Sequence, residues 1–130
     1  MDILKNIKVL DFGRYIAGPY CAALLGDLGA EVIRIERLVG SEDRYVHPID
    51  SDGGEGAMFM QMNRNKKGIT LNPTKEGAKE IVKKLTESAD VIVANLPPQT
   101  LKKMGIDYET LKKYNPRIIL TTVSAFGHGG

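Results

Sequence analysis

The sequence contains no tryptophan, a single cysteine (Cys21) and only two histidines (His47 and His128). One cysteine cannot form an internal disulfide, and it excludes a cysteine-rich metal site. Neither histidine has a cysteine or carboxylate at a metal-binding spacing, so we expect no metal ion and interpret both as loop residues rather than catalysts. The absence of disulfides favours a reducing, cytoplasmic compartment.

Long apolar runs and a large net charge are also missing. No stretch approaches the roughly 20 apolar residues of a transmembrane helix, and charged residues interrupt the start, MDILKNIKVLDF, so it lacks the layout of a signal peptide. The formal net charge is only +2, so we expect no nucleic acid and no membrane as a partner. A chain of 130 residues with 42% hydrophobic and 26% charged residues instead indicates one compact globular domain.

Short apolar, β-branched runs alternate with helical patterns. The runs at 7–11, 31–36, 68–71, 91–94 and 118–123 predict strands. A helix is expected from Pro19 to just before Gly29, another from Thr74 with a buried stripe at Ala78, Ile81, Val82 and Leu85, and two short ones at 98–104 and 108–114. This alternation predicts an α/β fold: a doubly wound, largely parallel sheet with helices on both faces.

Two segments depart from this pattern. Residues 37–65 lack periodicity and are rich in turn formers, so we expect an irregular excursion around a short turn at 57–62, a length that is usually functional or disordered. Its aspartates Asp43, Asp50 and Asp52 have no evident orienting partner. The chain ends SAFGHGG directly after an apolar run, and we interpret residues 1–130 as part of a longer domain.

Ligands of open parallel sheets bind beyond the carboxyl ends of the strands. Four polar or glycine-rich segments follow predicted strands: the elbow Ile16–Pro19, Arg37, Asn95–Pro97 and residues 124–130. Together they predict one elongated crevice. Arg37 and the basic run Arg64–Lys67 flank strand ends, so we expect them to bind phosphate, which arginine can grip bidentately.

The common nucleotide fingerprints are absent. Gly13 and Gly18 are too far apart for the dinucleotide motif G-x-G-x-x-G, and no G-x-x-x-x-G-K-[ST] occurs. Glu36, however, ends the second predicted strand, where a dinucleotide-binding domain carries its ribose-binding acid. NAD therefore stays open as an alternative ligand.

The segment VLDFGRYIAGPYCAALLGDLGAEVIRIER resembles the N-terminal signature of the family III CoA transferases, a family that also contains α-methylacyl-CoA racemases. The similarity continues through NRNKKGITL, EGAKEIVKKLTESADVIVANLPP and LKKMGIDYETLKKYNPRIIL to SAFGHGG. The resemblance implies that residues 1–130 are the N-terminal part of a Rossmann-like large domain that holds coenzyme A. It also implies acyl-CoA and carboxylic acid substrates, and an interlocked homodimer in the full-length parent.

The resemblance places the contacts to coenzyme A on loop residues. They are Ile16, Ala17, Arg37, Leu71, Asn72, Pro73, Thr74, Asn95, Leu96, Pro97 and Lys103. A one-residue gap in the alignment makes Thr74 and Lys75 interchangeable. Ile16 stands where formyl-CoA transferases carry a glutamine, which argues against oxalate or formate as the substrate.

The resemblance assigns no catalytic residue within this chain. The aspartate that forms the mixed anhydride and the enzyme–CoA thioester of the transferases maps beyond residue 130, as does the histidine–aspartate pair of the racemases, and His128 does not match that histidine. We therefore expect the CoA-binding portion of a transferase, inactive by itself. A portion of a racemase and a non-catalytic CoA-binding or assembly module are the alternatives.

Overall fold

A five-stranded sheet, parallel throughout, forms the centre of the molecule, in the order β3-β2-β1-β4-β5. The computed structural model describes residues 2–49 and 51–127. The strands are β1 (Lys8–Asp11), β2 (Glu31–Glu36), β3 (Lys67–Thr70), β4 (Val91–Ala94) and β5 (Ile119–Thr122). The predicted parallel sheet is confirmed: β2 and β4 have the expected bounds, β1 begins one residue later, and β3 and β5 differ by one residue at each end.

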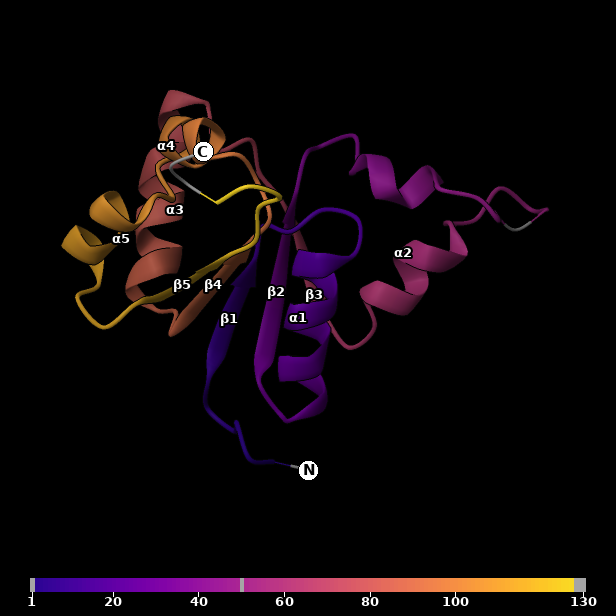
Figure 1. Ribbon diagram of the computed structural model, residues 1–130, viewed down its shortest axis with the longest axis horizontal. Coiled ribbons are helices and arrows are strands. Elements are labelled where there is room, and N and C mark those ends of the chain that lie inside the picture. Colours follow the sequence, from indigo (N-terminus) through magenta and orange to yellow (C-terminus); the bar gives the residue numbers. More distant parts are fainter. Residues whose placement is uncertain (1, 50, 128–130) are drawn as a thin grey trace.

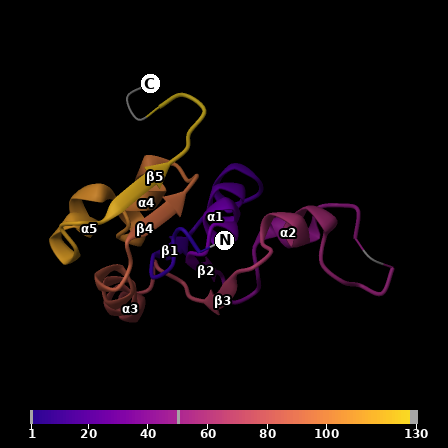
Figure 2. The ribbon, with the colours of Figure 1, turned by 90° about the horizontal axis from the view of Figure 1, so that it is seen from below.

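Helices cover both faces of the sheet, as predicted (Figures 1 and 2). One face carries α1 and the other carries α3, α4 and α5, whereas α2, which packs against the short 3₁₀ helix η1, lies to the side of the sheet past β3. Their bounds are α1 (Ala17–Asp27), η1 (Glu42–Tyr45), α2 (Ala57–Met62), α3 (Glu76–Glu87), α4 (Pro98–Met104) and α5 (Tyr108–Tyr114). The fold is therefore Rossmann-like and doubly wound.

Small residues allow α1 to lie close to the sheet. Gly18, Ala22, Ala23 and Gly26 are buried on its inner face, and a Cβ atom at Gly26 would come within 3.3 Å of the Val32 side chain. The core on this side also contains Val9 from the central strand β1 and Val93 from the adjacent strand β4, with Cys21 partly buried against it.

The larger core lies on the opposite face, under α3, α4 and α5. Helix α3 buries Ala78, Val82 and Thr86, which are spaced four residues apart and face the sheet. The predicted stripe was wrong for Ile81, which is 46% exposed. Ile81 stands one residue from Val82 and therefore lies at the border of that face. Thr86 can be buried because its hydroxyl donates a hydrogen bond to the Val82 carbonyl at 2.8 Å.

The excursion between β2 and β3 is ordered by a buried ionic network. Arg34, 2% exposed, donates to Glu36 at 3.1 Å, to Asp43 at 2.8 Å and to Asn63 at 2.8 Å. Phe59 of α2 stacks beneath Arg34, with the guanidinium carbon 5.0 Å from the ring centre. The expected short turn at 57–62 is thus helix α2, and Asp43 does have orienting partners, which corrects both expectations.

The strand order creates a switch point between β1 and β4. From β1 the chain moves outward through β2 to β3, and α3 then returns it to β4 on the other side of β1. The loops after β1 and β4 therefore diverge from neighbouring strand ends, at the upper edge of the sheet in Figure 1. In open α/β sheets this is where ligands bind.

Candidate functional site

A pocket of about 410 Å³ lies at this carboxyl edge. The loops after β1, β2, β3 and β4 all contribute to it, so it lies across the switch point. Its lining consists of Arg14, Tyr15, Arg37, Glu42, Asn72, Pro73, Thr74, Asn95, Leu96, Thr100 and Met104. Six residues predicted as coenzyme A contacts thus meet in one place: Arg37, Asn72, Pro73, Thr74, Asn95 and Leu96.

Arg14 is a second arginine of the pocket, and the sequence analysis missed it. Its Nη1 donates to the carbonyls of Gly13 at 2.7 Å, Phe12 at 3.2 Å and Ile35 at 3.4 Å, which fixes the guanidinium over two strand ends. No acceptor for its Nε or Nη2 is found among the described residues. Burial, and then the charge of Arg34, lower the pKa of Arg14, yet an arginine keeps its charge in proteins. Its position directly after a central strand was the available signal.

Arg37 lines the pocket and is half exposed. Its Nη2 pairs with Glu42 Oε1 at 2.5 Å. The pKa of Glu42 is lowered, first by the backbone N–H of its own residue and also by the charges of Arg37 and Arg14. Because an exposed ion pair contributes little stability, a ligand phosphate can replace Glu42 as the partner of Arg37 at small cost.

Asn95 ties the loop after β4 to the loop after β1. Its Oδ1 accepts from the backbone N–H of Arg14 at 2.7 Å, and its Nδ2 donates to the Arg14 carbonyl at 2.8 Å. Gly18 makes this contact possible, because a Cβ atom there would lie 2.7 Å from Asn95 Oδ1. The side chain of Asn95 therefore organises the pocket wall.

The loop after β3 forms the wall opposite. Asn72 Oδ1 accepts from the backbone N–H and the hydroxyl of Thr74, at 3.2 and 2.7 Å. Thr74 lines the pocket whereas Lys75 does not, so the geometry favours Thr74 of the two interchangeable candidates. Leu71 packs against the large core and donates its N–H to the Glu36 carbonyl at 2.7 Å, so its side chain lies outside the pocket.

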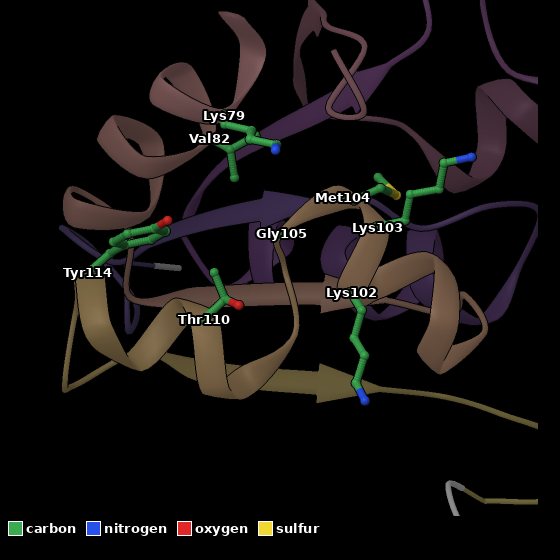
Figure 3. A pocket seen from close by; sticks show the side chains of 8 residues that line it. All are labelled: Lys79, Val82, Lys102, Lys103, Met104, Gly105, Thr110 and Tyr114. Carbon is green, nitrogen blue, oxygen red and sulfur yellow. The ribbon is translucent and has the colours of Figure 1, made fainter. Parts of the chain in front are cut away.

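Two further pockets share residues with the first one. Asn95 and Leu96 also line a space of about 440 Å³ with Pro97, Pro98 and residues 123–127. Met104 also borders a space of about 240 Å³ at the end of α4, between α3 and α5, which Lys103 lines (Figure 3). The Lys103 side chain points away from α3 and α5 in this view. Because they share lining residues, the three pockets are adjacent, as an elongated crevice would require.

Ile16 and Ala17 do not line these pockets. Both are exposed where α1 begins, next to Tyr15, and their contacts to coenzyme A stay a prediction.

The basic run 64–67 does not serve the pocket. The Lys66 side chain is buried and donates to Asp11 at 2.8 Å, to the Pro19 carbonyl at 2.7 Å and to Asn63 at 2.9 Å. Its ammonium group has three donors, and all are used. Arg64 pairs with Asp27, and Lys67 pairs with Glu31 where β2 and β3 begin, at the opposite edge of the sheet. The expectation that this run binds phosphate was therefore wrong for Lys66, and the positions of the other two do not support it.

Glu36 is not available to a ribose. It is 4% exposed and accepts from Arg34, Arg44 and Ser41. Burial alone would raise the pKa of Glu36, but the hydrogen bond from Arg44 and the charges of Arg34 and Arg44 outweigh it and lower the pKa to about 2. The structure thus argues against the NAD alternative.

Other site classes find little support within residues 2–49 and 51–127. No group of three or more His, Cys, Asp or Glu side chains there could hold a metal ion, and no helix in this part is long and apolar enough to cross a membrane. His47 is an exposed loop residue. His128 and Asp50, both considered above, lie outside the described residues.

Comparison with known proteins confirms the resemblance. Residues 4–130 match CoA-transferase family III. The succinyl-CoA:mesaconate CoA-transferase of Haloarcula marismortui is 39% identical over 98% of this chain and 33% of its own length, and the succinyl-CoA:glutarate CoA-transferase of Mus musculus is 38% identical over 100% and 30%. A crystal structure of a CAIB/BAIF family protein from Brucella suis superposes with a TM-score of 0.89 at 39% identity, covering 98% of this chain and 34% of that one.

The chain therefore spans about a third of the length of these relatives. Its sequence is similar to those of the two curated relatives, and its fold to that of the solved structure, along almost all of its length. This chain belongs to CoA-transferase family III.

Proposed function

We propose that this chain is the coenzyme A-binding portion of a transferase that moves CoA between carboxylic acids. The observation that carries the proposal is the pocket at the switch point, where Arg14 and Arg37 offer two guanidinium groups while Glu36 is withdrawn into a buried network. Coenzyme A is rich in phosphate, which arginine binds bidentately. The neighbouring pockets provide room for an elongated ligand.

The names of the two curated relatives described above favour CoA transfer over racemisation. In the proposed reaction, an aspartate carboxylate outside these residues attacks the thioester carbonyl, forming a mixed anhydride and releasing the CoA thiolate. The thiolate then attacks the aspartyl carbonyl, which releases the first carboxylic acid and leaves an enzyme–CoA thioester. The acceptor carboxylate takes over the CoA by the same two steps in reverse.

The residues of this chain bind and orient in this scheme. Arg14 and Arg37 hold phosphates, and Thr74 and Leu96 flank the ligand. Asp11 and Asp43, the aspartates nearest the pocket loops, are fully buried in ion pairs and are unsuited to attack a thioester. The interlocked homodimer and the cytoplasmic location stay predictions.

Calorimetric titration of the purified chain with CoA, NAD and ATP tests the ligand class. We expect CoA to bind in preference to the other two, and Arg14→Ala to weaken CoA binding. Lys84→Ala is the matched control, because Lys84 is exposed on the solvent side of α3. Tight binding of NAD without binding of CoA would refute the proposal.

The reaction itself is tested on the full-length parent. Incubation with an acyl-CoA and a second carboxylic acid in heavy water should give a new acyl-CoA by mass spectrometry. Deuterium uptake next to the thioester carbonyl without any exchange of the acid would indicate a racemase instead.

A further inference from the structure

The peptide group between Arg14 and Tyr15 is held from two sides. Its carbonyl accepts from Asn95 Nδ2 at 2.8 Å, and its N–H donates to Asp43 Oδ2 at 3.1 Å. Asp43 is 28 residues away from Tyr15 in the sequence, and Asn95 is 81 residues away from Arg14. Two side chains from distant segments thus fix one peptide unit in the wall of the pocket.

This peptide unit needs such support because Tyr15 has an unfavourable backbone conformation. Its φ is +60°, in the left-handed region that non-glycine residues other than Asn and Asp rarely adopt. The conformation has a consequence for the ligand, since the side chains on both sides of the peptide, Arg14 and Tyr15, line the pocket. A relaxed peptide would move one or both of them.

Asp43 is itself rigid. It is fully buried, and its Oδ1 and Oδ2 accept from Arg34 Nη2 at 3.1 and 2.8 Å. Arg34 is in turn held by Glu36 and Asn63. The carboxylate is therefore a fixed acceptor, and one of its oxygens serves Arg34 and the Tyr15 N–H together.

We propose that Asp43 is a positioning residue of the ligand pocket, which holds the Arg14–Tyr15 peptide so that both side chains face the ligand. The inference rests on the proposed function, because it concerns the same pocket. The long excursion between β2 and β3 then helps to shape the pocket, because its helix η1 carries both Asp43 and the pocket residue Glu42.

The first test needs no ligand. In Asp43→Asn, the single remaining oxygen goes to Arg34, and the amide NH₂ then faces the Tyr15 N–H, which loses its acceptor. Amide hydrogen exchange followed by NMR should show the Tyr15 amide exchanging at least about tenfold faster, with the Leu10 amide in β1 unchanged. Asp90→Asn is the matched control, because it removes a carboxylate bond to the Lys8 N–H (2.9 Å) at the other edge of the sheet.

The second test is affinity. Titration with CoA should give a dissociation constant at least about fivefold higher for Asp43→Asn and unchanged for Asp90→Asn. A folded Asp43→Asn variant with unchanged Tyr15 exchange overturns the inference, and so does faster exchange with unchanged affinity, since Asp43 would then only stabilise the fold.

If Asp43→Asn does not fold, amide hydrogen exchange of the wild-type chain tests the inference instead. The Tyr15 amide should exchange more slowly than that of Ile16, for which no acceptor is found among the described residues; equal rates overturn the inference. A wild-type chain that binds no CoA refutes the proposed function, and the exchange rates still show whether Asp43 holds the peptide.

Discussion

Arginine residues occupy three kinds of environment around the pocket. Arg34 is buried among the carboxylates of Asp11, Glu36 and Asp43. Arg14 is partly buried against backbone carbonyls, and Arg37 is half exposed beside one glutamate. Only the last two line the pocket. Burial and partners, rather than residue type, therefore separate the structural arginine from the two that can meet a ligand.

Arg37→Ala should weaken CoA binding by about 1.5–3 kcal/mol, the range for hydrogen bonds to charged groups. Arg37→Lys should recover only part of this, because the planar fork is lost. Calorimetry on the chain or its parent measures both, with Arg117→Ala, in an exposed turn before β5, as the control. A loss below a few tenths of a kcal/mol would mean that Arg37 is an ordinary surface residue.

Lys66→Met should lower the free energy of unfolding by about 3–5 kcal/mol. The substitution leaves Asp11 buried without its nearest cation, and removing one partner of a buried ion pair costs about this much. Urea denaturation measures the loss. Lys84→Met, on the exposed side of α3, should stay within about 0.5 kcal/mol of wild type. If the two variants unfold alike, the ion pair with Asp11 is not a stabilising feature.

At the scale of elements, the elbow between β1 and α1 connects the fold to the pocket. Helix α1 starts at Ala17, two residues after the Arg14–Tyr15 peptide that Asn95 and Asp43 hold. The first turn of α1 requires a glycine at position 18, because the loop after β4 approaches too closely to leave room for a side chain. The elbow glycine thus serves the contact between two loops, and only indirectly the ligand.

Gly18→Ala should destabilise the protein by about 1–3 kcal/mol, as overpacking does. The new Cβ would lie 2.7 Å from Asn95 Oδ1 and 2.9 Å from Gly13 Cα, so the two loops must move apart. Gly77→Ala in α3 is the matched control: nothing lies within 4 Å of its Cβ position, and it should stabilise by about 0.5–1 kcal/mol. Thermal unfolding that ranks the two variants the other way round would contradict this account of the elbow.

At the scale of the whole molecule, the buried network joins the excursion to the sheet and should make stability depend on acid. The pKa of Glu36 in the folded protein is about 2, below the roughly 4.3 of an unfolded glutamate. The folded state therefore binds fewer protons. The stabilisation is fully present above about pH 4.5 and is lost as the pH falls towards 2, on the order of 3 kcal/mol.

Urea denaturation between pH 6 and pH 2.5 measures this loss. Glu36→Gln should be less stable at pH 6 but should lose less stability on acidification than wild type. Equal pH dependence of the two proteins would show that another group carries the acid sensitivity.

These 130 residues by themselves should not transfer CoA, because the resemblance places the nucleophile outside them and the buried Asp11 and Asp43 cannot replace it. Mass spectrometry after incubation with an acyl-CoA and a carboxylate measures the exchange. Turnover that is lost on substituting a residue of this chain would mean that the active site has been misplaced.

The order of elements followed from the sequence because it depends on local patterns. Apolar runs located β2 and β4, and α4 has the predicted bounds 98–104. Six of the eleven predicted contacts lie in one pocket because the carboxyl ends of parallel strands share an edge, a property of the topology rather than of any single side chain. Arg37, Asn95 and Leu96 could thus be recognised from their places after strands, whereas Asn72, Pro73 and Thr74 were expected only from the resemblance to the family.

Only the tertiary structure decided which polar side chains are free. The sequence suggested no partner for Asp43, which is buried against Arg34. It suggested that Lys66 binds phosphate, whereas Lys66 pairs with Asp11, 55 residues away in the sequence. Arg14 was not predicted as a site residue and yet lines the pocket. Hydrogen bonds and ion pairs between distant segments leave no periodic trace in a sequence, because they depend on where folding brings two atoms. Hydrophobic periodicity therefore determined the framework of this protein, and long-range polar contacts determined its site.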